Sequence, residues 1–185
     1  TALISCEQNW YDTQKDTGLW RGIISTIEAT GDVTIILSNV TIRNNTALNV
    51  PILLSRSGED QGANVTIQIE GTNTLASAEV HMSGGVVVKQ GGTGTLKFTG
   101  SGTLTASAEG VVIGAPITGN IYQGTTKPYD CADITFAQTG TITATSSAGG
   151  DPVVGSAYGF SSKGTETSAS SSRISVQSGT LKEIN

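Results

Sequence analysis

The sequence predicts an all-β fold, a parallel β-helix (solenoid) of about five three-stranded coils with a short capping helix at the N-terminal end. Short runs alternate apolar and polar residues, which is the period of half-buried strands. Pairs of such runs recur along the chain, and self-similarity at intervals of roughly 20–50 residues is typical of repeat architectures. Glycine, at 24 of 185 residues, marks the corners between runs.

The clearest pair of runs is GTLKFTGSGTLTASA at 94–108, and similar pairs occur at 32–44, 64–78, 133–147 and 173–185. Aligning the ends of the first runs predicts one interior column, formed by Leu37, Ile69, Phe98, Phe136 and Val176. The centres of the second runs predict another column, formed by Ile42, Leu75, Leu104, Ile142 and Leu181. A third apolar run follows in four copies, at 51–54, 86–88, 111–113 and 152–154.

A β-propeller is the main alternative, because its four-stranded blades repeat at a similar interval. Propeller blades require antiparallel hairpins with tight turns. The Asn-Gly and Asp-Gly dipeptides that mark such turns do not occur in the sequence. The parallel β-helix is therefore the preferred interpretation.

The first 31 residues are predicted to form an N-terminal arm and cap, and residues 32–185 to form the β-helix domain. Residues 1–16 show no clear period. Apolar residues at helical spacing, such as Leu19, Ile23 and Ile27, predict a short amphipathic helix over 17–29 that covers the open end of the first coil. The alternative is an additional coil of strands in this segment.

The connections after the third runs carry most of the length variation, and the two longest are 114–132 and 155–172. They leave the same edge of each coil, so we expect them to lie side by side. Aromatic and charged residues in these connections suit sugars or protein partners. The candidate ligand-binding residues are Tyr122, Lys127, Tyr129, Asp130, Tyr158 and Phe160.

Composition limits the function classes. The net charge is −5 with no basic cluster, which argues against nucleic-acid binding, since neutralising phosphates requires Lys and Arg on one face. No apolar run approaches the roughly 18 residues of a membrane span. His81, the single histidine, is interpreted as an exposed loop residue, and we expect no metal and no cofactor.

The two cysteines and three sequons carry further expectations. A disulfide between Cys6 and Cys131 is predicted if the compartment is oxidising. Asn39, Asn44 and Asn64 begin Asn-x-Thr triplets and would be glycosylated only in a secreted eukaryotic chain.

Outward threonines form a further pattern. Thr41, Thr74, Thr103, Thr141 and Thr180 each precede the centre of a second run and are expected to stack in one column. A flat threonine array on a β-solenoid is similar to the surface of ice-binding proteins. The neighbouring column is expected to read Arg43, Ala76, Thr105, Thr143 and Lys182. Because this second column interrupts the array, ice binding is the least favoured function, and strand propensity explains the threonines.

The stretches NVTIQIEGTNTL, GTGTLKFTGSGTLTAS, GVVIG and DITFAQTGTITATSS resemble the right-handed parallel β-helix segments of secreted bacterial surface and carbohydrate-binding proteins in the pectate-lyase-like superfamily. The resemblance covers about residues 32–182 and implies an extracellular or cell-surface location. Lyase chemistry needs clustered acidic residues for Ca²⁺ and a nearby base, and the sequence shows no such cluster.

The favoured function is therefore a non-catalytic structural or adhesive protein. We expect it to assemble with itself, through residues 1–16 and 173–185, into a surface structure or filament. A polysaccharide-binding module is the alternative, and a polysaccharide lyase is a less favoured one.

Overall fold

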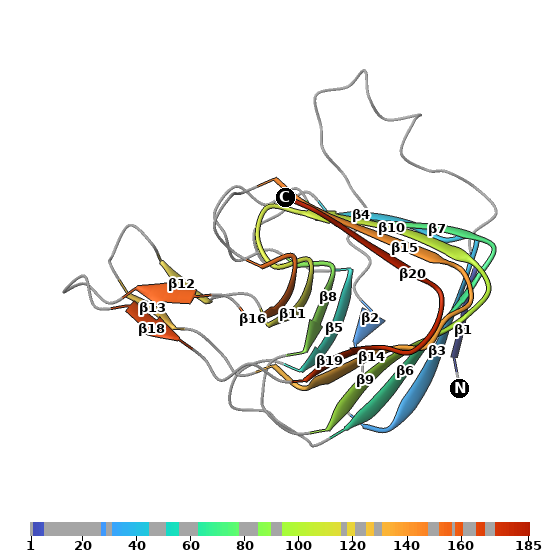
Figure 1. The fold of residues 1–185 in the computed structure, drawn as a ribbon, viewed down its shortest axis with the longest axis horizontal. Helices are drawn as coiled ribbons and strands as arrows, with labels where there is room; N and C mark the ends of the chain where they lie inside the picture. Colours follow the sequence, from blue (N-terminus) through green and yellow to red (C-terminus); the bar gives the residue numbers. More distant parts are fainter. Residues whose placement is uncertain are drawn as a thin grey trace.

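The structure, a computed structural model, describes residues 2–5, 27–28, 31–44, 51–55, 63–77, 85–89, 94–115, 118–120, 125–127, 131–147, 152–156, 158–160, 166–168 and 173–185. Within these residues the regular elements are β-strands, and they form three parallel sheets and two antiparallel pairs (Figure 1). The predicted all-β class with parallel strands is confirmed.

Each parallel sheet gathers one strand from each repeat. The first sheet consists, in spatial order, of β1 (Ala2–Ser5), β3 (Val33–Ser38), β6 (Asn64–Glu70), β9 (Thr95–Gly100), β14 (Asp133–Phe136) and β19 (Ile174–Val176). The second consists of β4 (Thr41–Asn44), β7 (Thr72–Ser77), β10 (Thr103–Ala108), β15 (Thr141–Ser146) and β20 (Thr180–Ile184). The third consists of β2 (Ile27–Glu28), β5 (Ile52–Ser55), β8 (Val87–Lys89), β11 (Ile113–Ala115) and β16 (Val154–Ser156).

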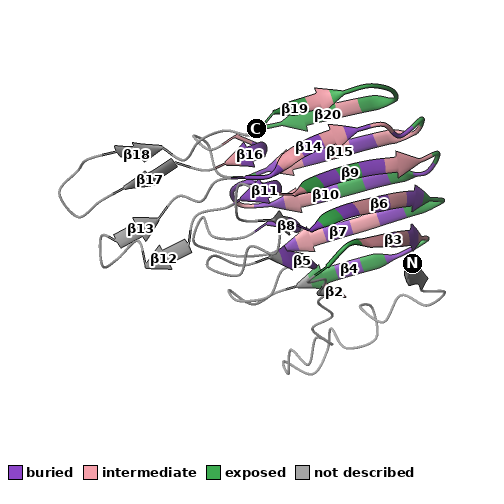
Figure 2. Ribbon diagram, turned by 90° about the horizontal axis from the view of Figure 1, so that it is seen from below, coloured by how far each residue is buried: buried purple, intermediate pink, exposed green. Residues whose placement is uncertain are grey.

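The chain visits the three sheets in turn. β3, β4 and β5 belong to the first, second and third sheets, and β6, β7 and β8 repeat that order one layer further along. Figure 2 shows these layers side by side, from β3 and β4 near the N-terminus to β19 and β20 at the C-terminus. The third apolar runs of the sequence form the third sheet, as predicted, with Ile52 beside Val87 and Ile113 beside Val154.

The N-terminal segment contributes strands to the same sheets. β1 pairs in parallel with β3, with Ser5 opposite Ser38, and β2 pairs in parallel with β5. The predicted helix is therefore wrong at Ile27 and Glu28, where the alternative of an additional coil fits. The reason is that β5 can pair with a strand on the side away from β8, and β2 takes that place. Ile27 N donates a hydrogen bond to Pro51 O at 2.9 Å. The rest of the predicted helix lies outside the described residues.

The interior is a continuous apolar core between the sheets. On the first sheet Ile67 lies opposite Phe98, and Phe98 lies opposite Phe136. The rings of Phe98 and Phe136 stack with centroids 5.0 Å apart and planes at 7°, and both residues are fully buried. The prediction of Ile69 in this column is wrong, because Ile69 lies opposite Gly100. A two-residue offset keeps apolar side chains facing inward, so both registers satisfy the hydrophobic pattern.

The second sheet shows the same two-residue offset from the predicted register. Leu104 lies opposite Asn73 and Ile142, whereas Leu75 lies opposite Ala106. Asn73 is buried, and its side chain is hydrogen-bonded at the corner between the first two sheets. Its Oδ1 accepts from Val40 N at 3.0 Å, and its Nδ2 donates to Glu70 O at 2.9 Å and Thr103 O at 3.3 Å. Asn73 thereby joins three consecutive layers.

Candidate functional site

The outward surface of the middle of the second sheet carries small, uncharged side chains at regular positions. It is formed by alternate residues of β7, β10 and β15, which we call the threonine face: Thr72, Thr74, Ala76, Thr103, Thr105, Ser107, Thr141, Thr143 and Thr145. All nine side chains are exposed or half-buried, and none is charged. Their inward neighbours, such as Leu104 and Ile142, are fully buried, which fixes the direction of the face.

The strand register aligns these threonines in two columns. One column contains Thr72, Thr103, Thr141 and Thr180, and the second contains Thr41, Thr74, Thr105 and Thr143. The prediction of a single column through both Thr74 and Thr103 is wrong, because Thr74 lies opposite Thr105. The predicted interruption at Ala76 falls in a third column, which continues through Ser107 and Thr145. Arg43 and Lys182 lie on the outermost strands of the sheet, β4 and β20. As predicted, Arg43 lies opposite Ala76 and Lys182 lies opposite Thr143, so Lys182 ends the second column.

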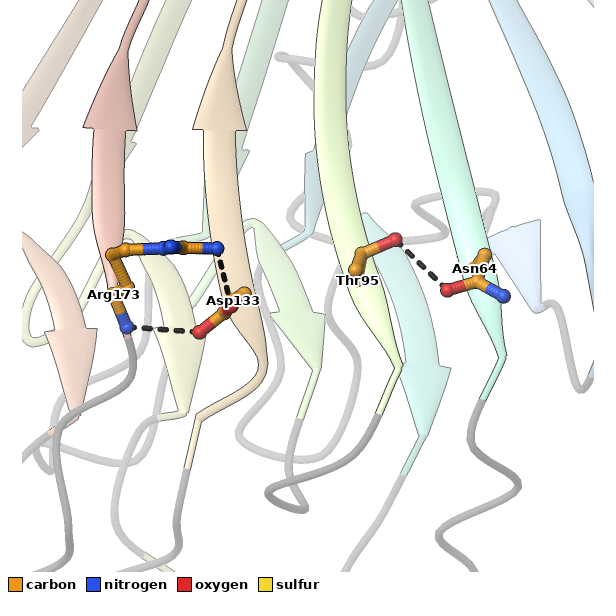
Figure 3. Close-up of polar contacts among 4 residues, drawn as sticks. All are labelled: Asn64, Thr95, Asp133 and Arg173. Carbon is orange, nitrogen blue, oxygen red and sulfur yellow. Dashed lines mark hydrogen bonds and ion pairs between the residues drawn. The ribbon is translucent and has the colours of Figure 1, made fainter.

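The outward surface of the first sheet has a different composition. It carries Lys97, Glu70 and Asp133, and Gln68 Nε2 donates to Glu70 Oε1 at 2.6 Å. Figure 3 shows two further contacts at the start of its strands. Thr95 Oγ1 donates to Asn64 Oδ1 at 3.0 Å, and the Arg173 guanidinium lies 3.3 Å from Asp133 Oδ2. Threonine richness without charge is therefore particular to the middle three strands of the second sheet, β7, β10 and β15.

A second candidate surface is the C-terminal edge of the layers. Among the described residues, the large apolar side chains that are exposed are Ile174 (43%), Val176 (54%) and Ile184 (50%). They belong to β19 and β20, the edge strands of the first and second sheets (Figure 2). Val176 lies opposite the fully buried Phe136, so it continues the interior column into an exposed layer.

The long connections form two antiparallel strand pairs beside the sheets. β12 (Thr118–Asn120) pairs with β13 (Thr125–Lys127), and β17 (Tyr158–Phe160) pairs with β18 (Glu166–Ser168). β13 contacts β17, so the prediction that the two connections lie side by side is confirmed. Of the candidate ligand-binding residues, Lys127, Tyr158 and Phe160 belong to these strands, whereas Tyr122, Tyr129 and Asp130 lie outside the described residues.

The predicted glycosylation sites lie at the corner between β3 and β4 and at strand ends. Asn39 is exposed, and its Oδ1 accepts a hydrogen bond from Thr72 N at 3.0 Å. Asn64 is exposed at the start of β6, and Asn44 ends β4. His81 lies outside the described residues.

The disulfide between Cys6 and Cys131 stays a prediction, because Cys6 lies outside the described residues. Cys131 is buried just before β14. Ser5, the residue before Cys6, lies beside Ser38 at the opposite end of the first sheet, and four strand steps of about 4.8 Å separate β1 from β14. A disulfide needs Cα atoms within about 7 Å, so its formation requires β1 to leave this edge. Mass spectrometry of the oxidised protein decides the pairing: a linked peptide would confirm the disulfide and place β1 away from β3, and two alkylatable thiols would refute it.

No group of three or more His, Cys, Asp or Glu side chains that could hold a metal ion occurs within the described ranges. The same ranges contain no helix with the length and hydropathy required of a membrane span. Comparison with models of protein families, with curated proteins and with solved structures found no match for this chain.

Proposed function

We propose that this chain is a right-handed parallel β-helix of about five coils that acts as a non-catalytic, extracellular structural or adhesive protein and assembles with copies of itself. The observation that carries the proposal is the exposed apolar edge formed by Ile174 and Val176, which lie opposite the fully buried Ile134 and Phe136. An edge strand presents unpaired N–H and C=O groups, which are a template for pairing with another chain.

The partner proposed for this edge is the first layer of a second copy. β1 and β4 form the opposite edges of the same two sheets, and all strands within each sheet are parallel. Placing β19 of one copy beside β1 of the next continues the first sheet in the same sense. β4 lies in the layer of β3, one strand step behind β1, so the proposed contact is made through the first sheet. Such a head-to-tail contact does not close on itself, so repetition gives a filament.

The placement of β1 changes one part of the expected assembly. Residues 2–5 pair with β3 of their own chain, so the proposed contact uses the free edge of β1 and involves no exchange of the N-terminal arm between copies. The rest of the arm, up to residue 16, lies outside the described residues.

Substitution of the exposed edge tests this assembly. Ile174→Glu and Val176→Glu place a charge where the second copy would pack, and we expect each variant to lose self-association because burying an unpaired charge is costly. Light scattering over a range of protein concentrations, with electron microscopy, measures the effect. Lys97→Glu is the control, because Lys97 is exposed on β9, a strand in the middle of the first sheet and away from its edges. This variant should assemble like the unchanged chain. An unchanged chain that stays monomeric at high concentration would contradict the proposal.

Polysaccharide binding by the paired connections is the second candidate function. The contact between β13 and β17 brings the segments that carry Lys127, Tyr158 and Phe160 together, and aromatic residues next to polar groups suit sugar rings. A glycan array distinguishes the two functions. Binding that is lost in Tyr158→Ala with Phe160→Ala, in a protein that remains monomeric, would favour the polysaccharide module.

A further inference from the structure

We propose that the threonine face binds the surface of ice, a function separate from the end-to-end assembly. The face combines two regular threonine columns with a complete absence of charge over its nine residues. In Figure 1 the strands β7, β10 and β15 lie over one another along the direction in which the layers stack.

The spacing of the threonines is set by the backbone. Neighbouring parallel strands lie about 4.8 Å apart, so the hydroxyls within a column, such as Thr72, Thr103 and Thr141, repeat at about that distance. The two columns are separated by two residues along a strand, which corresponds to about 6.6 Å. The spacing within a column is near the in-plane repeat of oxygen positions in hexagonal ice. A rigid sheet therefore presents rows of hydroxyl groups that match the lattice in one direction.

The chemistry of threonine suits contact with an uncharged lattice of water. Each hydroxyl donates one hydrogen bond and accepts others, as a lattice water does. Each methyl group covers the surface between hydroxyls, and Cβ branching leaves few side-chain rotamers to be lost on binding. A charged side chain would instead orient water around itself and would have to lose that hydration. The absence of charge on the middle three strands therefore complements a neutral surface.

Strand propensity alone does not explain this composition. The outward positions of β6, β9 and β14 in the first sheet share the same fold and solvent exposure, yet they include Glu70, Lys97 and Asp133. A general preference for threonine on exposed strands would act on both sheets equally. The difference between the two sheets indicates that the second sheet meets a neutral, regular surface.

The test follows the growth of small ice crystals in solutions of the purified chain. We expect the temperature at which the crystals grow to fall below their melting temperature. We also expect faceted crystals and inhibition of ice recrystallisation. Thr105→Lys and Thr143→Lys place a long, charged side chain in the centre of the face, and each is expected to abolish all three effects. Circular dichroism and thermal melting establish that the variants remain folded.

Thr99→Lys is the matched control, because Thr99 is an outward, half-buried residue of the first sheet on the neighbouring strand β9. It should retain the activity of the unchanged chain. The proposal is overturned if the unchanged chain has no effect on ice growth, or if Thr105→Lys and Thr99→Lys are equally active. Binding to crystalline cellulose or chitin that is lost in Thr105→Lys, without any effect on ice, would also overturn it and assign the face to a periodic polysaccharide.

Discussion

Replacing Phe98 with alanine is expected to lower the free energy of unfolding by about 3–5 kcal/mol. Phe98 is fully buried and stacks on Phe136 with ring centroids 5.0 Å apart, at the centre of the core between the sheets. Truncation leaves a cavity, because the backbone ladders on both sides keep the neighbouring strands about 4.8 Å away. Urea unfolding followed by circular dichroism measures the loss.

The adjacent residue gives the control for this substitution. Thr99 faces outward on the same strand, so Thr99→Ala should change the unfolding free energy by less than about 1 kcal/mol. The double variant with Phe136→Ala should lose less than the sum of the two single variants, because both remove the same stacked contact. Equal stability of Phe98→Ala and the unchanged chain would refute the interior position of the ring.

Replacing Gly100 with alanine is expected to destabilise the chain by at least about 1–3 kcal/mol from backbone strain alone. Gly100 has a φ of +95°, which L-residues with a side chain rarely adopt. An added Cβ would also overlap the backbone of Ile69 in the layer below, 2.7 Å from its nitrogen. The strand corners pack backbone against backbone, so the overlap has no flexible side chain that could move away. Urea unfolding measures the effect.

Gly31→Ala is the matched control, since a Cβ at Gly31 would meet no atom within 4 Å. Gly31 is exposed, and alanine there should leave stability unchanged or slightly improved through the reduced entropy of the unfolded chain. If both glycine substitutions had equal effects, the close packing of the corners would be contradicted.

The three sheets were predictable because the sequence repeats a local pattern in which apolar residues alternate with polar ones. Period-2 alternation determines which residues point inward, and it does so correctly for Phe98, Leu104 and Phe136. The third runs were predictable from a different signal, because each is a short continuous apolar stretch, which is typical of a buried strand. They overlap the strands β5, β8, β11 and β16.

The register between layers could not be obtained from this alternation, because shifting a strand by two residues preserves every inward and outward position. The sequence alignment matched Leu75 with Leu104 by their similarity, whereas the structure sets Leu104 opposite Asn73. A different signal was available in the four glycine–threonine pairs at the corners: Gly71-Thr72, Gly102-Thr103, Gly140-Thr141 and Gly179-Thr180. These threonines form one column in the structure, since close packing at the corners aligns the glycines.

The N-terminal strands were missed for a different reason. Ile27 lies in a run whose apolar spacing fits a helix, and short apolar runs do not distinguish helix from strand by period alone. The decisive contact is tertiary, because the edge of β5 offers hydrogen-bonding groups to any strand beside it. The threonine array was predicted, but its columns were wrong because they depend on the layer register: Thr74 lies opposite Thr105 and not opposite Thr103.

A crystal structure of the chain would show the pairing of β7 with β10 and so test the stacking of the layers most directly. Both proposed surfaces depend on that stacking, and the threonine columns depend on this one register. We expect Thr72 opposite Thr103 and Thr74 opposite Thr105, with Asn73 buried and opposite Leu104. A structure with Thr74 opposite Thr103 and Leu75 opposite Leu104 would break both columns and contradict the proposed threonine face.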